Sequence, residues 1–101
     1  YTITQNYQTA NYTIQASDAG KHISVTTGGV NVVSSVFNVG DAVSIFNNST
    51  TSQTISSGPN VTMYLAGGSS TGNRTLAQRG LASVLCVSGN NIFVIVGQGL
   101  T

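Results

Sequence analysis

Short runs in which apolar and polar residues alternate recur along the chain, and clusters of Gly, Asn, Asp and Ser separate them. Alternation with a period of two places successive side chains on opposite faces of a strand, so each run can turn one face toward a core. No stretch repeats its apolar residues at the spacing of a helix. The sequence therefore predicts an all-β protein, with strands at residues 1–5, 11–16, 22–27, 30–36, 42–47, 53–57, 61–66, 81–88 and 91–97.

Clusters of turn-forming residues divide these strands. Asp18-Ala19-Gly20 can hold an Asx-type turn that is closed by Gly20, and Gly58-Pro59-Asn60 predicts a bend. Gly28-Gly29 and Gly89-Asn90-Asn91 each have the composition of a tight hairpin, in which two neighbouring strands pair. Residues 67–73 hold no core-forming side chain, and this loop is either a contact site or simply mobile.

The length of 101 residues fits one domain with one modest core. Apolar residues share a strand face at three places, namely Ile23 with Val25, Val43 with Ile45, and Val61 with Met63 and Leu65. Many short strands separated by regular turns are typical of an antiparallel β-sandwich of the jelly-roll kind. We expect this sandwich to span residues 11–101, with residues 1–10 as an extended N-terminal arm.

The apolar segment at residues 92–96 breaks the alternation, because both of its faces are apolar. Either this strand is central and covered on both sides, or a neighbouring chain covers its outer face. A small sandwich covers only one face of each sheet, so we expect an oligomer in which Phe93 and Ile95 lie at a subunit interface. The long loop before Leu81 is the alternative cover for these two side chains.

The N-terminal arm is a second candidate for contact between subunits. Residues 1–10 are mainly polar, and Ile3 is the only strongly apolar side chain among them. An extended segment of this kind can add a strand to the edge of a neighbour's sheet. We therefore place Tyr1 and Ile3 at the candidate subunit interface.

Charged residues are rare, since the chain holds only Lys21, Arg74, Arg79, Asp18 and Asp41, for a formal net charge of +1. Three dispersed cations cannot neutralise a run of phosphates, so we expect no nucleic-acid partner. So small a net charge also leaves little repulsion between copies, which favours an oligomer or a docked subunit. Arg74 and Arg79 are candidates for a subunit boundary, and pairing with an aspartate of the same chain is the alternative.

Few side chains could support catalysis or hold a metal ion. His22 is the only base available to a serine or cysteine nucleophile, and its place at the start of a strand is ordinary. Asp18 and Asp41 lie in turns that explain them, and no spacing groups them with other metal ligands. Cys86 lies in an apolar run and is expected to be buried. We therefore predict no enzymatic activity, no catalytic residue, no cofactor and no metal ion.

No membrane partner is predicted, because the longest wholly apolar run is residues 92–96 and a bilayer span needs roughly 20 residues. Several Asn-X-Ser/Thr tripeptides, such as Asn60-Val61-Thr62, fit the N-glycosylation pattern. In a chain so rich in Asn, Ser and Thr such matches arise by chance, and we do not expect glycosylation.

Four segments, taken in order, resemble a small β-sandwich module of tailed-bacteriophage virion proteins: residues 12–21 (YTIQASDAGK), 37–45 (FNVGDAVSI), 74–84 (RTLAQRGLASV) and 93–97 (FVIVG). In that family a threonine-rich strand leads into a DAGK turn, a VG turn opens the next strand, and an apolar strand precedes a glycine-containing tail. The resemblance covers residues 12–99, and the chain departs from the pattern at Gly58-Pro59 and at Cys86.

The resemblance implies a non-enzymatic module on the outer surface of a virion. Such modules occur as terminal domains of tail fibres and spikes and as small proteins on the outside of capsids, similar in use to trimeric decoration modules. It therefore implies a homotrimer that binds the major capsid protein or another virion protein and stabilises the shell as a decoration (cement) protein. Two rivals stay open: a tail-fibre or spike domain that grips host glycans through Tyr and Asn side chains, for example in residues 67–73, and a secreted glycan-binding domain unrelated to viruses.

Overall fold

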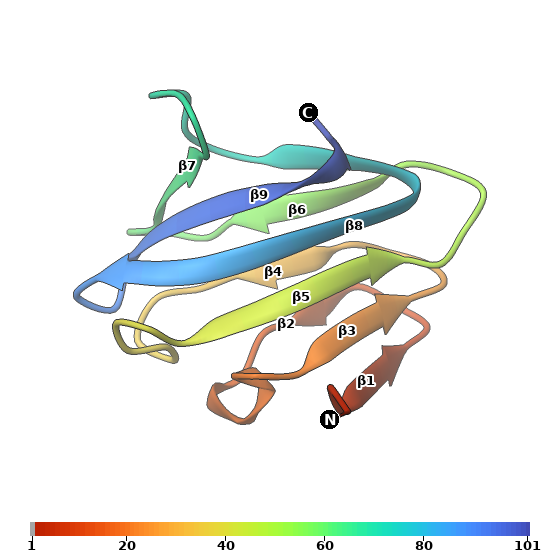
Figure 1. Cartoon of the computed structure of the whole chain (residues 1–101), viewed down its shortest axis with the longest axis horizontal. Helices are drawn as coiled ribbons and strands as arrows, with labels where there is room; N and C mark the ends of the chain where they lie inside the picture. The colour runs from red at the N-terminus through yellow and green to blue at the C-terminus, as the bar shows by residue number, and fades with distance from the viewer. Residues whose placement is uncertain (1) are drawn as a thin grey trace.

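The alternating runs form strands that wrap around one apolar core in a computed structural model of the protein, which describes residues 2–101 (Figure 1). The elements follow in the order β1 (Gln5–Gln8), β2 (Tyr12–Thr13), the 3-10 turn η1 (Ala16–Asp18), β3 (His22–Val25), β4 (Val30–Val32), β5 (Ala42–Asn47), β6 (Gln53–Ser57), β7 (Thr62–Leu65), β8 (Arg74–Ser88) and β9 (Ile92–Leu100). The predicted all-β class is confirmed. None of the described residues forms a helix long and apolar enough to cross a membrane.

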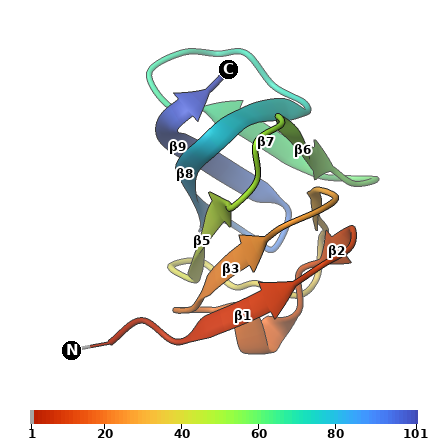
Figure 2. The same ribbon diagram turned by 90° about the vertical axis from the view of Figure 1, so that its right-hand side faces the viewer.

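The strands make one sheet that curls into a nearly closed barrel, in the order β1-β3-β5-β8-β6-β4-β2, with β9 beside β8 and β7 beside β9. Strands β1, β3, β5 and β9 lie on one side of the molecule with the second half of β8, and we call this side the front wall. Strands β2, β4 and β6 lie opposite and form the back wall (Figure 1, Figure 2). The single core lies between the two walls.

The first six strands stack in parallel rather than antiparallel. On the front wall β1 pairs with β3 and β3 with β5, while on the back wall β2 pairs with β4 and β4 with β6. Each strand is therefore followed by a strand of the opposite wall, not by its own neighbour in the sheet. The predicted antiparallel arrangement is wrong for these strands, because the antiparallel ladders between strands are those of β8 with β5, β6 and β9.

The Gly28-Gly29 pair does not form the predicted hairpin, because it carries the chain from β3 on the front wall to β4 on the back wall. A Cβ on Gly28 would overlap the backbone of Asn11, and one on Gly29 would overlap the carbonyl oxygen of Thr54. Close approach of backbones therefore requires these glycines. The turn at Gly89-Asn90-Asn91, by contrast, joins the antiparallel strands β8 and β9 as predicted.

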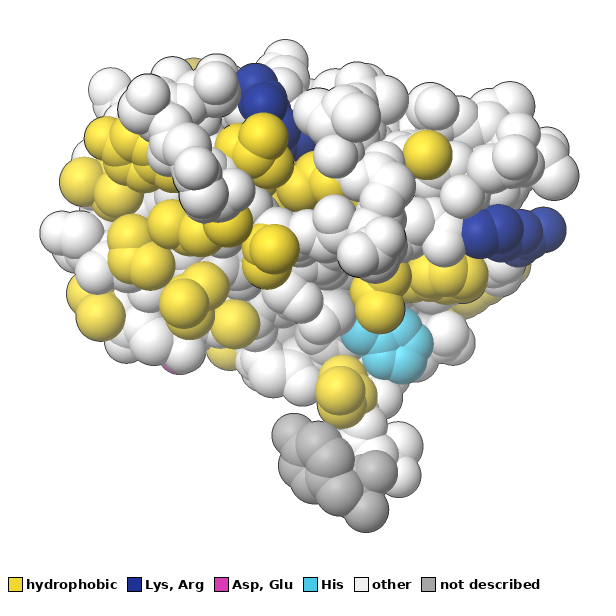
Figure 3. Space-filling view, turned by 45° about the horizontal axis from the view of Figure 1, so that its top comes forward, with side chains coloured by type: hydrophobic (Ala, Val, Ile, Leu, Met, Phe, Trp, Pro, Cys, Tyr) yellow, Lys and Arg dark blue, Asp and Glu magenta, His cyan; other side chains and the backbone are white. Residues whose placement is uncertain are grey.

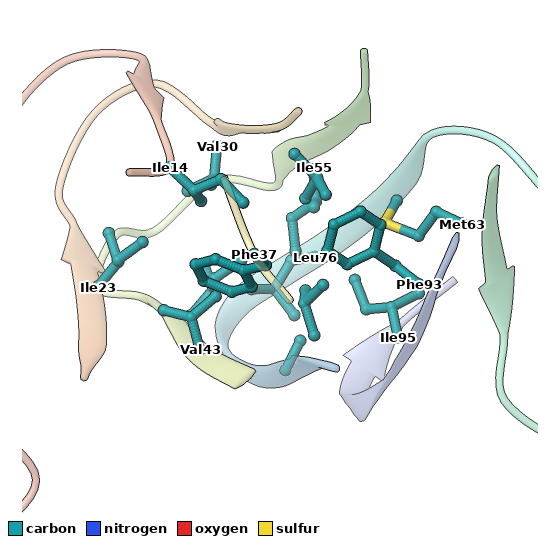
Figure 4. Close-up of a cluster of buried hydrophobic side chains, with 14 of the residues drawn as sticks. Ile14, Ile23, Val30, Phe37, Val43, Ile55, Met63, Leu76, Phe93 and Ile95 are labelled. Atoms are coloured by element: carbon teal, nitrogen blue, oxygen red, sulfur yellow. The ribbon is translucent and has the colours of Figure 1, made fainter. Parts of the chain in front are cut away.

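The core is built from the inward side chains of both walls. Phe37, from the connection between β4 and β5, and Phe93 of β9 are fully buried, with ring centroids 6.3 Å apart (Figure 4). The other buried apolar residues are Ile14, Ile23, Val25, Val30, Val32, Val43, Ile45, Ile55, Met63, Leu76, Ala82, Val84, Cys86 and Ile95. The strand faces predicted to enter the core from β3 and β5 do so.

Strand β8 joins the two walls, since its first half pairs with β6 and its second half with β5. Residues 74–80, expected in a loop before Leu81, belong to this strand. The strand bends between its halves, where Arg79 has a positive φ of 56° and the ladder with β9 is interrupted. The buried side-chain amide of Asn47 donates to the backbone carbonyls of Leu76 and Ala77, just before this bend, and to that of Thr51 in the connection between β5 and β6. The bend directs the second half of β8 onto the front wall.

Part of the predicted N-terminal arm lies in the sheet. Residues Gln5–Gln8 form β1, which pairs with β3 of the same chain. One edge of this segment is therefore already occupied within the domain. Among the described residues, only residues 2–4 precede the sheet.

Candidate functional site: an outward apolar face

The second half of β8 carries apolar side chains on both of its faces. Its inward set is Ala82, Val84 and Cys86, and all three are buried. Leu81, Leu85 and Val87 point outward and are 51%, 41% and 39% exposed. Because side chains alternate along a strand, the run that fills the core also places an apolar stripe on the outer surface.

Residues of neighbouring strands extend this stripe sideways. Leu85 lies opposite Ala42 of β5 on one side and opposite Val94 of β9 on the other. Val94 in turn lies opposite Tyr64 of β7, whose side chain is 37% exposed. Partners in register share a face of the sheet, so these four side chains form one row across four strands.

Two further pairs lie beside this row. Phe46 of β5 is opposite Leu81, and Val96 of β9, which is 54% exposed, is opposite Ser83. The hydroxyl oxygens of Ser83 and of Ser44 on β5 are 3.2 Å apart and share a hydrogen bond. The hydroxyl groups between the apolar side chains are therefore partnered within the chain.

We call the outward apolar side chains of these four strands the apolar face. It consists of Ala42, Phe46, Tyr64, Leu81, Leu85, Val87, Val94 and Val96. None of the charged residues of the chain belongs to it. Figure 3 shows hydrophobic side chains gathered on this side of the molecule, with the basic side chains toward the margins. An uncharged surface of this kind is typical of a contact with another protein.

The outer surface of the back wall has the opposite character, and we call it the hydroxyl face. Thr54 of β6 lies opposite Thr75 of β8, and Asn31 of β4 lies between Thr13 and Ser56. The Asn31 side-chain amide donates a 3.1 Å hydrogen bond to Oγ1 of Thr13. The outer surface of the back wall thus carries hydroxyl and amide groups where the apolar face carries hydrocarbon side chains. Exposed apolar side chains are therefore concentrated on one side of the molecule.

Phe93 and Ile95, which we predicted at a subunit interface, were placed on the wrong face of their strand. Both are 0% exposed and belong to the core. Their partners on β8 are inward-facing residues, and partners in register share a face. The outward positions of β9 are held by Val94 and Val96 instead.

Sequence reasoning did not place Leu81, Leu85 or Tyr64 at an interface. For β8 a signal was present, because every residue from Leu81 to Val87 except Ser83 is apolar, so both faces of the strand carry apolar side chains. For Tyr64 no such signal exists in its own segment. It joins the apolar face only because β7 pairs with β9.

Of the two residues predicted at the interface from the N-terminal arm, Ile3 lies away from the apolar face. Tyr1 is outside the described residues. Ile3 is 45% exposed and precedes β1, which is separated from β8 by β3 and β5. Whether Ile3 contacts a neighbouring subunit stays a prediction.

Arg74 and Arg79 interact with polar groups near them. Arg74 donates to the backbone carbonyls of two residues just before it, and Arg79 donates to Oδ1 of Asn48. Among residues 2–101, neither arginine forms a hydrogen bond with Asp18 or Asp41. The alternative, pairing with an aspartate of the same chain, is therefore not found among these residues, and the place of both arginines at a subunit boundary stays a prediction.

Asp18 is buried, with an exposure of 1%. Its Oδ1 accepts a 2.8 Å hydrogen bond from the Asn6 amide. Its Oδ2 accepts hydrogen bonds from the Tyr12 hydroxyl at 2.6 Å and from the Gln15 backbone N–H at 2.8 Å. Burial, followed by the hydrogen bond to Asp18, raises the pKa of Tyr12. The turn at Asp18-Ala19-Gly20 is present, but the backbone closes it, because the Lys21 N–H donates a 2.9 Å hydrogen bond to the Asp18 carbonyl. The Asp18 carboxylate instead binds side chains of β1 and β2.

The remaining titratable side chains are dispersed. Cys86 is buried as predicted, and burial raises the pKa of its thiol. The His22 ring lies 3.2 Å from the Gln5 amide, and Asp41 accepts a 2.9 Å hydrogen bond from the Asn38 N–H. Among residues 2–101 no group of three or more His, Cys, Asp or Glu side chains comes together, and no pocket opens. The apolar face is therefore the strongest candidate for a functional surface.

No protein-family model matches the sequence, and no curated protein matches it significantly. Neither comparison links the chain to phage virion proteins, so that resemblance rests on the four sequence segments alone. The function is therefore inferred from those segments and from the two outer faces of the fold.

Proposed function

We propose that this chain is a non-enzymatic structural subunit on the outer surface of a bacteriophage particle, where it acts as a capsid decoration protein. The observation that carries the proposal is the apolar face. Apolar side chains in water are unfavourable, and packing against another protein removes them from water. The sequence segments support the virion setting, and the apolar face supports a subunit that is docked rather than free.

A decoration subunit stabilises a shell by bridging neighbouring capsid proteins. The bridging interface must break before the shell swells or bursts, so bound protein shifts the equilibrium toward the intact shell by mass action. Burial of apolar surface contributes about 25 cal/mol per Å², against which the entropy cost of association must be set. The apolar face supplies surface for such a bridge, and no chemical step is needed.

The partners in this proposal are other copies of the chain, in a homotrimer, and the major capsid protein or another virion protein. A formal net charge of +1 leaves little repulsion between subunits packed closely together. The hydroxyl face would point toward solvent, because hydroxyl and amide groups are well hydrated there. A relation to the jelly-roll-like β-sandwich modules of virion proteins belongs to the proposal, and the two facing walls support it.

Electron microscopy of intact virus particles tests this proposal. A gold-tagged antibody raised against the domain is expected to label the shell, and particles that carry the protein should release their genome at a higher temperature than particles that lack it. Absence of label from every particle would contradict the virion role. Label confined to the tail would contradict the decoration role.

The parallel stacking of β1 to β6 favours one alternative, a tail-fibre or spike domain that contacts host glycans. Stacked parallel strands make a solenoid-like body of the kind found in elongated proteins. The hydroxyl face offers donors and acceptors that suit sugar hydroxyls. Binding to a glycan array that Thr54→Ala and Asn31→Ala weaken, and that Leu85→Ser leaves unchanged, would support this alternative.

A further inference from the structure

We infer that the apolar face packs against the same face of a second copy of this chain, around a two-fold axis. The inference rests on the proposed function and changes one part of it, because it places a pair of copies at the apolar face instead of the three copies that the resemblance implies. Its support comes from the charge of the face, from the state of its polar groups and from its area.

The face carries no formal charge, so a copy of itself is an electrostatically suitable partner. The five charged residues are not part of the face: Asp18 is buried in its network, Asp41 accepts a hydrogen bond from the Asn38 N–H, Lys21 precedes β3, and the two arginines are hydrogen-bonded to groups near them. A partner with charged groups at this position would lose their hydration without gaining a counter-charge. Two identical neutral faces avoid this cost.

The two serine hydroxyls within the face need no partner from outside. Ser44 and Ser83 lie on adjacent strands and hydrogen-bond to each other. Further polar side chains border the face, namely Gln98 of β9 and His22 of β3, whose ring lies 3.2 Å from the Gln5 amide. An apolar centre with a polar margin is the usual arrangement of an interface between proteins.

The area of the face matches the needs of a stable pair. From their exposed fractions of 37% to 54%, Tyr64, Leu81, Leu85, Val87 and Val96 together expose on the order of 400 Å² of apolar surface. Two copies would thus bury roughly 800 Å² of apolar surface, and a homodimer interface is about 65% apolar. The whole interface would then cover roughly 1,200 Å², which is the lower end of the range for specific interfaces.

A two-fold axis through the face makes the association closed, so it stops at two copies. Sheets pack face to face at a distance of about 10 Å, and residues near the axis meet their own counterparts. Leu85 is central on the face, since Ala42 flanks it on β5 and Val94 flanks it on β9. We therefore expect Leu85 of one copy to contact Leu85 of the other.

Sedimentation equilibrium of the full chain measures this association. We expect the mass of two copies, and we expect the double variant Leu85→Ser with Val96→Ser to raise the Kd for pairing by at least about tenfold. Val39→Ser is the matched control, because Val39 is apolar and 63% exposed but lies in the turn before β5, outside the face. A monomer or a trimer of the unmodified chain overturns the inference, as does an equal effect of the control.

Cross-linking keeps the inference testable if the serine variants fail to fold. Leu85→Cys places a thiol near its own counterpart, and mild oxidation is expected to give a covalent pair. Cys86 is buried, so the unmodified chain should give no such product. Val39→Cys is the control, and covalent pairs from both variants at the same rate, or from neither, overturn the inference.

These measurements separate the pairing from the proposed function. A monomer whose antibody labels the shell would overturn the pairing and leave the decoration role standing, with a capsid protein on the apolar face. A pair in solution without label on any particle would support the pairing and contradict the virion role.

Discussion

The Tyr12 hydroxyl donates a 2.6 Å hydrogen bond to Oδ2 of Asp18, in a chain that has two acidic residues in all. The side chain of Asn6 and the backbone of Gln15 supply the other donors to the same carboxylate. No cation is among these donors, so hydrogen bonds stabilise the buried group. The network links β1 and β2, which are the two ends of the sheet order, and so closes that end of the core.

Replacing Asp18 with Ala should therefore destabilise the fold strongly. The change leaves three part-buried donors without their acceptor, and an unpaired group costs about 1–3 kcal/mol where it is buried. We expect the free energy of unfolding, measured by urea denaturation, to fall by about 3 kcal/mol or more. Asp41→Ala is the control, because Asp41 accepts one hydrogen bond from the exposed Asn38, and its loss should cost about 1 kcal/mol or less. Equal losses would contradict the role given to the network.

Alkaline pH should weaken the fold. Burial and the hydrogen bond to Asp18 raise the pKa of Tyr12 above its ordinary 10.0, and burial raises the pKa of Cys86 above its ordinary 9.0. A group whose pKa is higher in the folded chain stabilises the fold below its unfolded pKa, and this contribution is lost as the pH rises through the folded pKa. The midpoint of thermal unfolding should therefore stay level near neutral pH and fall above about pH 9.

Two variants can show whether Tyr12 or Cys86 causes the loss of stability at alkaline pH. Tyr12→Phe removes the phenol and Cys86→Ala removes the thiol, so each variant lacks one of the two titrations. Both should be less stable than the unmodified chain at neutral pH, but their midpoints should fall less steeply above about pH 9. Unchanged slopes in both variants would mean that other groups cause the alkaline loss.

Inward and outward positions of β9 should respond very differently to substitution. Phe93 is 0% exposed and packs near Phe37, so Phe93→Ala should lower the free energy of unfolding by about 3–5 kcal/mol. Val96 is 54% exposed on the same strand, and Val96→Ser in dilute protein should change it by about 1 kcal/mol or less. Urea denaturation of both variants measures these changes. Similar losses of unfolding free energy would contradict the finding that Phe93 points into the core and Val96 points outward.

Local features of the fold could be predicted from the sequence, whereas strand partners could not. Alternation and turn residues predicted the strands near β5 and β6 and the turn at Gly89-Asn90-Asn91, because each depends on a few adjacent residues. The Gly28-Gly29 pair looks the same in a hairpin and in a crossing between walls. What distinguishes the two is the approach of the backbones at Asn11 and Thr54, which lie far away in the sequence.

The candidate site was predicted in part for a similar reason. Apolar residues on both faces of β9 predicted that one of its faces would lie outside the core. They did not indicate which face, because Phe93 and Val94 are both apolar. Which side chains of β9 point into the core depends on the register of β9 with β8, and the ladder between these strands shifts register between Cys86 and Ser88. A one-residue shift reverses the faces of a strand, and a single segment does not encode it.

The back wall has no room for a side chain at Gly29. A Cβ there would overlap the carbonyl oxygen of Thr54, and a backbone atom cannot swing away as the end of a side chain can. Gly29 also accepts a 3.0 Å hydrogen bond from the Tyr12 N–H and donates one to Oδ1 of Asn11. A shift of Gly29 would therefore disturb β2 as well, and Gly29→Ala should lower the free energy of unfolding by about 3 kcal/mol or more.

Gly68→Ala is the matched control for this change. A Cβ on Gly68 would meet nothing closer than the carbonyl oxygen of Leu65, at 4.0 Å. Alanine restricts the unfolded chain more than glycine does, so the stability of this variant should be unchanged or raised by up to about 1 kcal/mol. If urea denaturation finds Gly29→Ala as stable as Gly68→Ala, β4 does not approach β6 this closely. The parallel pairing of the back wall, which brings these two strands together, would then be contradicted.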